Sequence, residues 1–372
     1  MLNIERPDEA SRLRRTMTQW SMMLRQPRAD EHEDQPRYVS YDNLRLSSGE
    51  TLSRKKVILM TGGCSVPTCT MCPFTNENNY GHTRSADRLL QQIQAVLTQK
   101  ADEPSYELLS LYNDGSFFAP SEVPADIQLE IARLVAQMGI RRLVVESLPQ
   151  FVTRERLQPF AELLGDVELE IGIGFQSAHD VIREILVNTR VSQRAFEGAL
   201  SLMAELGVIP KIYLMIKPPF VTEAEALTDV IESVAYLKSR GVEGVTLCPT
   251  RVSRNTVAWE LYQTGDYAPP NLWTVLEAVR IAHRETAVRV ACINLRGSDF
   301  ESVFPDSCPL CADAIVDALL DFSETGNTRA LDLDCDCRPA LEPAPLETPR
   351  LLQRAMSVLE RRGIGDAEQS TR

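Results

Sequence analysis

The sequence predicts an α/β protein, built as a partial or full (β/α) barrel with an N-terminal extension and a C-terminal cysteine module. Six short, β-branched runs alternate with amphipathic stretches of helical periodicity, which is the pattern of parallel strands joined by helical crossovers. The apolar content of 44% is sufficient for a large core. Two groups of closely spaced cysteines interrupt this repeating pattern. An open α/β sheet has the same order of elements, so the order alone does not distinguish the two architectures.

The predicted elements follow one another regularly along the chain. A first helix is expected at residues 8–26, within a polar N-terminal extension. The strands are expected at residues 56–62, 106–113, 141–147, 167–175, 209–216 and 244–249. The helices between them are expected at residues 85–99, 121–139, 192–207 and 222–241, where apolar residues recur at helical spacing and a glycine closes the last three.

This pattern divides the chain into four segments. They are an N-terminal helical and polar extension (1–50), a (β/α) barrel (51–300), a cysteine-rich metal module (301–345) and a C-terminal helix and tail (346–372). The first twenty residues carry charges throughout, and no stretch reaches the roughly 18 apolar residues of a membrane span. We therefore expect a cytoplasmic protein that does not bind a membrane.

Charge and cysteine content limit the possible functions. The net charge of −13 gives no overall attraction for a polyanion such as RNA. In a reducing compartment, nine cysteines are not expected to form disulfides, so their clustering indicates metal or redox chemistry.

The first cysteine group is MTGGCSVPTCTMCPF, residues 60–74, which we call the cysteine loop. It directly follows the first predicted barrel strand, and reactive groups of such folds lie at the carboxyl ends of the strands. Three thiolates, Cys64, Cys69 and Cys72, suit a 4Fe-4S cluster with one iron left open. Two alternatives remain: a zinc site completed by His82, and three packed cysteines without metal.

Further segments carry a resemblance to a known family. After the cysteine loop come LYNDGSFFAPSEVP, VVESLPQFVT, IGIGFQSAHDVIREILVNT, YLMIKPPFVTEAEA and DYAPPNLWTVLEAV. In their order and wording these segments resemble the radical S-adenosylmethionine (radical SAM) enzymes, in the branch that includes the radical SAM subunit of archaeal archaeosine synthase and is distantly similar to the elongator catalytic subunit. The resemblance covers about residues 54 to 340. The spacing CxxxxCxxC differs from the CxxxCxxC of most of the superfamily.

The resemblance implies an enzyme with a 4Fe-4S cluster and S-adenosylmethionine as cofactors, which generates a 5′-deoxyadenosyl radical that abstracts hydrogen from the substrate. Cys64, Cys69 and Cys72 would hold the cluster. The backbone of Met71 would meet the adenine. The residues that would contact S-adenosylmethionine or substrate at the strand ends are Asn113, Asp114, Gly115, Ser116, Glu146, Gln176 and Lys217. The acidic residue precedes the glycine at 115, and Gln176 stands where the branch often has Glu.

A second cysteine group lies near the C-terminus. Cys308 and Cys311 form a CxxC pair, and Cys335 and Cys337 form a CxC pair after 23 intervening residues. Four thiolates are sufficient for tetrahedral zinc or for an auxiliary iron-sulfur cluster. Next to a radical SAM resemblance we favour the auxiliary 4Fe-4S cluster, which would relay electrons, hold substrate or give up a sulfur atom.

Three functional classes are compatible with these features. The favoured one is a radical SAM enzyme that acts on a small molecule, such as a nucleoside or nucleotide in a specialised biosynthetic pathway, with sulfur insertion as one variant. The alternative is an enzyme that modifies a base in transfer RNA. The third class is a non-catalytic metal protein, which the strand-end motifs disfavour. An electron-donor protein such as flavodoxin or ferredoxin is the expected partner.

Overall fold

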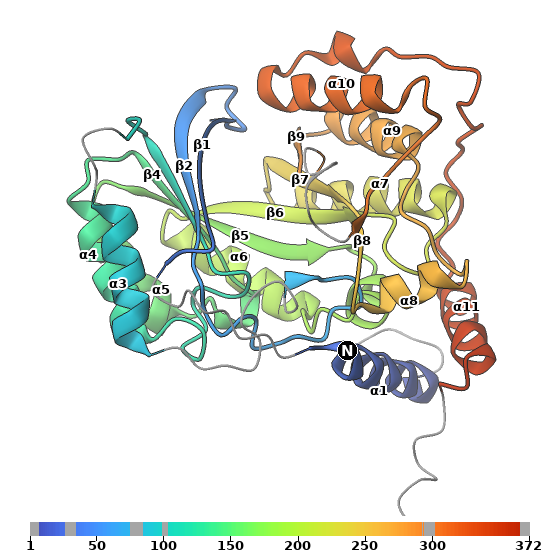
Figure 1. Cartoon of the computed structure of the whole chain (residues 1–372), viewed down its shortest axis with the longest axis horizontal. Coiled ribbons are helices and arrows are strands. Elements are labelled where there is room, and N and C mark those ends of the chain that lie inside the picture. Colours follow the sequence, from blue (N-terminus) through green and yellow to red (C-terminus); the bar gives the residue numbers. More distant parts are fainter. Residues whose placement is uncertain are drawn as a thin grey trace, which may run out of the picture.

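An eight-stranded sheet forms the centre of the protein (Figure 1). The computed structural model describes residues 7–26, 35–74, 85–98, 103–291, 293 and 302–364. The strands are, in sheet order, β1 (Tyr38–Arg45), β2 (Thr51–Ile58), β3 (Leu108–Tyr112), β4 (Arg142–Glu146), β5 (Glu168–Gln176), β6 (Ile209–Ile216), β7 (Gly244–Pro249) and β9 (Ala287–Val290). A separate ribbon pairs β8 (Val252–Ser253) with β10 (Ser302–Val303).

The sheet is a curled half-barrel. From β2 to β9 all neighbouring strands are parallel, while β1 pairs antiparallel with β2. The turn after β1 reaches the start of β7, because a Cβ atom at Gly244 would lie 2.6 Å from Ser47 Oγ. Within the described residues β1 and β9 are not paired with each other, so the barrel stays open. The predicted α/β fold of partial-barrel type is confirmed.

The six predicted strands appear as β2 to β7, and two further strands of this sheet, β1 and β9, were not predicted. β9 has only four residues, too few for a periodicity to show. β1 lies inside segment 1–50, which we had assigned to a helical extension, and it joins the sheet as an edge strand. Its polar sequence YVSYDNLR, of which half the residues are exposed, is typical of an edge strand and shows no hydrophobic pattern. The four-segment division itself stays a prediction.

Helices cover the outer face of the sheet. They are α3 (Ala86–Leu97), α4 (Ala125–Ala136), α5 (Arg154–Leu164), α6 (Gln193–Glu205), α7 (Glu223–Ser239), α9 (Leu272–His283) and α10 (Ala312–Thr325), with the short turns η1 (Pro149–Phe151) and η4 (Thr328–Leu331). Alternate residues of each strand point to opposite faces. In β3, Leu109 and Leu111 join the large core under the helices, whereas Leu108 and Tyr112 belong to a small cluster on the inner face.

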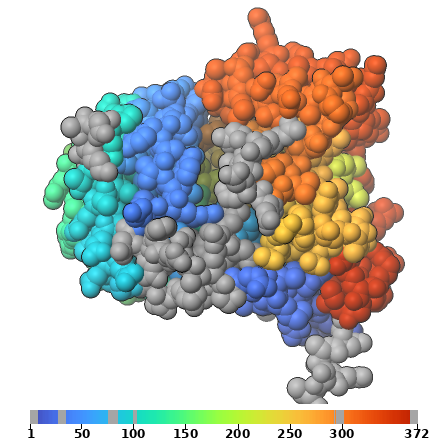
Figure 2. Space-filling view, viewed as in Figure 1, coloured from blue at the N-terminus to red at the C-terminus, as the bar shows by residue number. Residues whose placement is uncertain are grey.

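A second core joins the two ends of the chain. It contains Met17 and Trp20 of α1 (Pro7–Leu24), Leu351 of α11 (Thr348–Arg361), Ile185 of the π-helical turn η2 (Ile182–Leu186) and Leu261 of α8 (Val257–Gln263). Figures 1 and 2 show α1 and α11 side by side at the bottom of the view, with α10 at the top. None of the helices in the described part of the chain combines the length and apolarity needed to cross a membrane.

Candidate active site and second metal centre

The cysteine loop begins at the carboxyl end of β2, at the mouth of the half-barrel. The chain that leads into the loop continues the pairing of β2 with β3: Leu59 N donates to Tyr112 O at 2.7 Å, and Thr61 Oγ1 donates to Asn113 O at 3.2 Å. Gly63 turns the chain with a φ of +76°, which glycine adopts without steric cost. The loop therefore lies at the strand ends, as the sequence predicts.

The three thiols of this loop lie near enough to interact electrostatically. After burial and the Glu122 carboxylate, the thiols of Cys69 and Cys72 both raise the pKa of Cys64. Burial, and then the neighbouring thiol of Cys72, raises the pKa of Cys69 to about 12.

Three thiols in one loop fit a 4Fe-4S cluster. Each thiolate of such a cluster binds a different iron, so three ligands leave the fourth iron open. Burial, followed by the nearby Glu122 carboxylate, raises the pKa of Cys64 well above its usual range. Buried thiols of this kind ionise when a metal replaces the proton, so binding of a cluster here would release protons. His82, the candidate fourth zinc ligand, lies outside the described residues.

Arg25, just after the end of α1, holds the cysteine loop through its backbone carbonyl groups. Its guanidinium donates to Cys72 O at 2.7 Å, to Cys69 O at 2.6 Å and to Pro67 O at 3.2 Å. The side chain is buried. Three bonds from one planar cation fix the carbonyl groups of two candidate cluster ligands. The N-terminal helix is thus a structural part of the site, which the sequence did not indicate.

We expect Arg25→Gln to weaken the loop and to lower the reduction potential of a bound cluster. The variant loses bonds from a charged donor, which costs about 2–3 kcal/mol of unfolding free energy, and it removes a positive charge beside two cluster ligands, so the reduced cluster is less stabilised. Potentiometric titration followed by electron paramagnetic resonance measures the shift. Arg15→Gln, an exposed position on the same helix, is the matched control. Equal potentials in both variants would refute the role of Arg25.

Glu122 links the cysteine loop to the loop after β3. Its Oε1 accepts hydrogen bonds from Ser65 N at 2.8 Å and Ser65 Oγ at 2.7 Å, while Oε2 accepts from Asn113 Nδ2 at 3.0 Å and Ser116 N at 2.5 Å. Burial raises the pKa of Glu122 above its usual value, although its hydrogen bonds oppose this. Sequence reasoning missed this carboxylate, which begins a predicted helix and shows no motif.

Gly115 is required by this arrangement. A Cβ atom at position 115 would lie 1.9 Å from Glu122 Oε2 and 3.1 Å from the backbone of Cys64. Because both loops approach the same point, only a glycine leaves room for the carboxylate. Of the predicted cofactor contacts, Asn113, Gly115 and Ser116 are therefore gathered around Glu122, next to Cys64.

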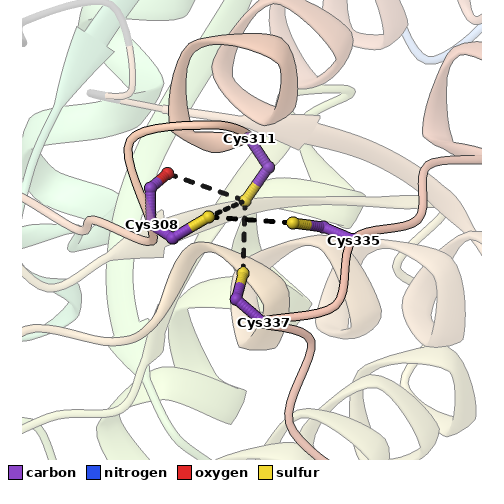
Figure 3. Close-up of side chains that lie close together, drawn as sticks. All are labelled: Cys308, Cys311, Cys335 and Cys337. Atoms are coloured by element: carbon purple, nitrogen blue, oxygen red, sulfur yellow. Dashed lines mark hydrogen bonds between the residues drawn. The ribbon is translucent and has the colours of Figure 1, made fainter.

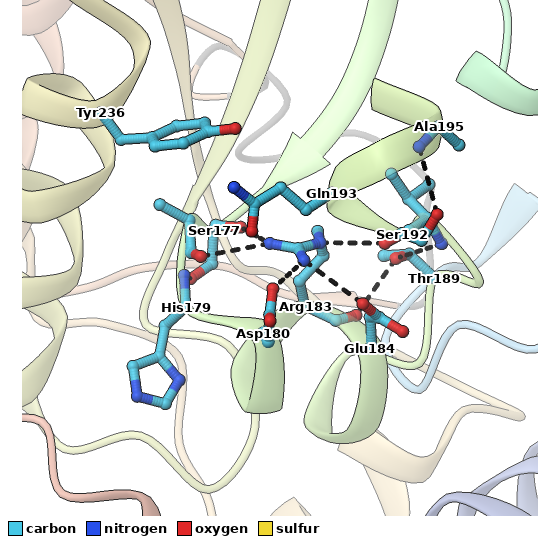
Figure 4. A network of polar contacts seen from close by, with 12 residues as sticks. Ser177, His179, Asp180, Arg183, Glu184, Thr189, Ser192, Gln193, Ala195 and Tyr236 are labelled. Atoms are coloured by element: carbon cyan, nitrogen blue, oxygen red, sulfur yellow. Dashed lines mark hydrogen bonds and ion pairs between the residues drawn. The ribbon is translucent and has the colours of Figure 1, made fainter. Parts of the chain in front are cut away.

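The segment after β5, residues 177–192, supports the other side of the cysteine loop. Thr70 N donates to Val187 O at 3.0 Å, and Thr68 Oγ1 donates to Asn188 O at 2.7 Å. Arg183 orders this segment from inside, as Figure 4 shows. Its guanidinium donates to Val191 O and Ser177 O, each at 2.9 Å, and pairs with Asp180.

A buried carboxylate behind this segment gives a prediction for pH. Ser177 Oγ donates to Asp229 Oδ1 at 2.5 Å, and burial raises the pKa of Asp229 from 3.8 to about 7. The folded protein therefore binds the extra proton between these values, and stability falls as the pH rises through them. We expect a loss of about 2–4 kcal/mol from this carboxyl group. Asp229→Asn keeps the acceptor, so chemical denaturation at several pH values should show a flatter profile. An unchanged profile would contradict the prediction.

The remaining predicted cofactor contacts lie in separate places. Met71 packs against the second core with its side chain. Asp114 accepts a hydrogen bond from Arg37 Nη1 at 2.7 Å in an ion pair. Gln176 ends β5 with a φ of +70° and folds back over Gly174, where a Cβ atom would lie 2.5 Å from Gln176 Nε2.

The ammonium group of Lys217 binds partners outside the cysteine loop and the loop after β3. Its Nζ donates to Ala268 O at 2.7 Å and pairs with Glu223 at 2.9 Å. Lys217 is buried, not a solvated surface lysine. The structure thus brings Asn113, Gly115 and Ser116 together but leaves Lys217 in contacts with the loop before α9. The cofactor roles of all these residues stay predictions.

Glu146 belongs to a polar group on the inner face of the sheet, which we call the lumen cluster: Tyr112, Glu146, Lys211 and Tyr213. Tyr213 Oη donates to Glu146 Oε1 at 2.5 Å, and Lys211 Nζ donates to Tyr112 Oη at 3.3 Å. Burial raises the pKa of Glu146, and the Lys211 ammonium opposes the rise. Gly172 leaves room for this group, because its Cβ atom would lie 2.9 Å from side-chain atoms of both Glu146 and Tyr213.

The second cysteine group forms a compact site, which we call the four-cysteine site (Figure 3). Cys308 and Cys311 precede α10, and Cys335 and Cys337 follow η4. All four sulfur atoms lie within 4.8 Å of one another. Donation from Trp273 Nε1 of α9 lowers the pKa of Cys337 to about 6. The predicted grouping of these four residues is confirmed.

The chain is similar in sequence to two archaeal proteins that share one name. No family model matches the chain. It is 27% identical over 312 residues to archaeosine synthase subunit beta of Methanosarcina acetivorans, covering 81% of this chain and 87% of that protein. It is 24% identical over 254 residues to the subunit of the same name from Thermococcus kodakarensis, covering 67% and 76%.

Two solved structures are similar to this one in backbone fold. Elp3 of Methanocaldococcus infernus gives a TM-score of 0.40 at 14% identity, covering 75% of this chain and 58% of that one, which is less than two thirds of its length. anSMEcpe, solved with AdoMet and the Cp18Cys peptide, gives a TM-score of 0.40 at 12% identity, covering 84% and 98%.

The half-barrel, its cysteine loop and the sequence matches define a radical SAM-like enzyme. The chain is a distant homologue of archaeosine synthase subunit beta. The resemblance predicted from the sequence is thereby confirmed.

Proposed function

We propose that this chain holds a 4Fe-4S cluster through Cys64, Cys69 and Cys72, binds S-adenosylmethionine at the remaining iron, and abstracts hydrogen from a small polar molecule. The observation that carries the proposal is the position of the cysteine loop at the mouth of the half-barrel, where three partly buried thiols lie near one another. When bound, the two cofactors would supply a 5′-deoxyadenosyl radical from one transferred electron.

The chain's own task is to hold and enclose the reacting groups. Arg25 and Glu122 fix the cysteine loop from two sides, so the cluster ligands keep their places before anything binds. Asn113 and Ser116 are proposed to contact S-adenosylmethionine. Both donate hydrogen bonds to Glu122, which also binds Ser65, the neighbour of Cys64. A hydrogen donor must then be positioned at near-attack distance in a site that excludes water.

The lumen cluster supports a small polar substrate. It combines a carboxylate, an ammonium group and two phenols on the inner face of the sheet, from strands β3, β4 and β6. Such a set recognises hydroxyl, amine and carboxyl groups at short range, as in a nucleoside or similar metabolite. The net charge of −13 favours the same class over a polyanion. An electron-donor protein such as flavodoxin or ferredoxin is the proposed partner.

The specific test is anaerobic reconstitution with iron and sulfide, followed by reduction in the presence of S-adenosylmethionine. We expect 5′-deoxyadenosine by mass spectrometry, with more formed when candidate nucleosides are added. Tyr213→Phe removes the donor to Glu146 while keeping the ring, so it should reduce the substrate-stimulated part and leave the basal cleavage. Absence of 5′-deoxyadenosine from cluster-loaded protein would overturn the proposal.

A second candidate is an enzyme acting on RNA, and the distant homology to archaeosine synthase subunit beta favours it. Salt dependence distinguishes the two. If binding depends on contacts with several phosphates, the affinity should fall by about 10³-fold or more as salt rises from about 50 to 200 mM. We expect turnover of the true substrate to change little over this range. Tight, salt-sensitive retention of transfer RNA would support the RNA candidate instead.

A further inference from the structure

The sulfur atoms of the four-cysteine site are spaced like the ligands of one ion. Cys308 Sγ lies 3.5 Å from Cys311 Sγ and 3.7 Å from Cys335 Sγ, and Cys311 Sγ lies 3.5 Å from Cys337 Sγ (Figure 3). Zinc-sulfur bonds of about 2.3 Å, arranged as a tetrahedron, give sulfur-sulfur edges of about 3.8 Å. The observed spacing is close to this tetrahedron.

An iron-sulfur cube needs a different arrangement. Each of the four thiolates binds a different iron at a corner of the cube, so the cysteine sulfur atoms lie on opposite sides of the cluster and far from one another. Sulfur-sulfur distances of 3.5 and 3.7 Å in the four-cysteine site leave no room for such a cube.

The backbone fixes each pair of cysteines at its spacing. Cys308 O accepts hydrogen bonds from Cys311 N and Ala312 N, each at 3.1 Å, which leads the chain into α10. Cys335 O accepts from Arg338 N at 2.9 Å, which forms a turn around Cys337. Opening the site to the width of a cube would disturb these turns.

Donors around the site favour thiolates. Trp273 Nε1 donates to Cys337 Sγ at 3.4 Å, and the Ser307 hydroxyl lies 3.7 Å from the same sulfur. The Arg338 guanidinium stands over the Trp273 ring, 5.4 Å from its centroid. Outer contacts of this kind orient metal ligands and offset the negative charge of four thiolates around a divalent ion.

We propose that Cys308, Cys311, Cys335 and Cys337 hold one Zn²⁺ ion in a closed tetrahedral site, and not the auxiliary cluster that the sequence favoured. Four thiolates fill the coordination of zinc, and zinc undergoes no redox change. The site then contains no sulfide to donate and no electron to relay. Its role is to fasten the segment after α10 to α9 and to the N-terminal end of α10.

Metal analysis of the full-length Cys64→Ala/Cys69→Ala/Cys72→Ala variant tests the proposal, because only the four-cysteine site remains. Purified without added metal and oxygen, it should contain about one zinc per chain and neither iron nor acid-labile sulfide. Four irons with sulfide, one iron without sulfide, or no metal would each overturn the proposal. Since the cysteine loop is absent from this variant, the result is independent of the proposed radical chemistry.

Two further measurements identify the ligands. Cys335→Ser/Cys337→Ser should lose the zinc and melt at a lower temperature, while Cys248→Ser, a cysteine outside both groups, should retain it. If the double variant does not fold, Co²⁺ exchanged into the triple variant gives the same information. Visible absorption bands of tetrahedral thiolate coordination are expected, and bands of octahedral Co²⁺ would contradict the assignment.

Discussion

Replacing Cys64, Cys69 and Cys72 with Ala should abolish 5′-deoxyadenosine formation, to the level of the buffer blank. The three thiolates are the proposed attachment of the cluster, and S-adenosylmethionine has no other proposed site for receiving an electron. Iron and sulfide analysis should show the loss of one cluster, and product analysis by mass spectrometry should show the loss of cleavage. Each single substitution should have nearly the same effect, because residues that act as a unit are not additive.

The matched control for this experiment is Cys248→Ser, which removes one thiol outside both cysteine groups. It should keep its cluster and its cleavage activity. Cleavage of S-adenosylmethionine by the triple variant at a rate above the blank would disprove the central proposal, whatever the metal content of the four-cysteine site.

Glu122→Gln should remove most of the bound cluster and destabilise the fold, although it changes only one oxygen to an amide group. Each carboxylate oxygen accepts one hydrogen bond from a backbone N–H, which cannot reverse, and one from a side chain, the Ser65 hydroxyl or the Asn113 amide. An amide nitrogen in either position therefore faces at least one backbone N–H. Unsatisfied buried donors cost about 1–3 kcal/mol each, so we expect a loss of about 2–5 kcal/mol.

Chemical denaturation measures the stability, and iron content after reconstitution measures cluster retention. Glu130→Gln makes the same chemical change at an exposed position of α4 and should leave both unchanged. A Glu122→Gln protein with full iron content and unchanged stability would show that the carboxylate does not position the cysteine loop.

The sequence predicted what depends on local pattern. The periodicity of β2 to β7 and of the helices between them was sufficient for the half-barrel, and the strand-end rule placed the cysteine loop at its mouth. Two contacts could not be predicted. Arg25 reaches Cys69 across 44 positions, and its place depends on how α1 docks. Glu122 meets Ser65 of the cysteine loop across 57 positions, and no motif marks Glu122 itself.

The site residues show the same limit. Lys217 stands at the end of β6 in the sequence, yet its ammonium is taken up by Ala268 O and Glu223. A strand end places a backbone at the mouth, whereas the direction of a long side chain depends on distant partners. The sequence did not decide between zinc and an iron-sulfur cluster at the four-cysteine site for a similar reason. It gives the number of ligands, whereas the distances between their sulfur atoms depend on the folded turns.

The shared core of α1 and α11 sets an order of events during synthesis. Helix α1 is synthesised before all the elements that it packs against, which are η2, α8 and α11. We therefore expect Arg25 to hold the cysteine loop firmly only after these elements have been made. We expect the cysteine loop to lack its hydrogen bonds with Arg25 on nascent chains and to have them on finished chains, when iron-sulfur assembly factors act. Cluster insertion would then be a late maturation step, and chains that end before residue 348 should be loaded poorly.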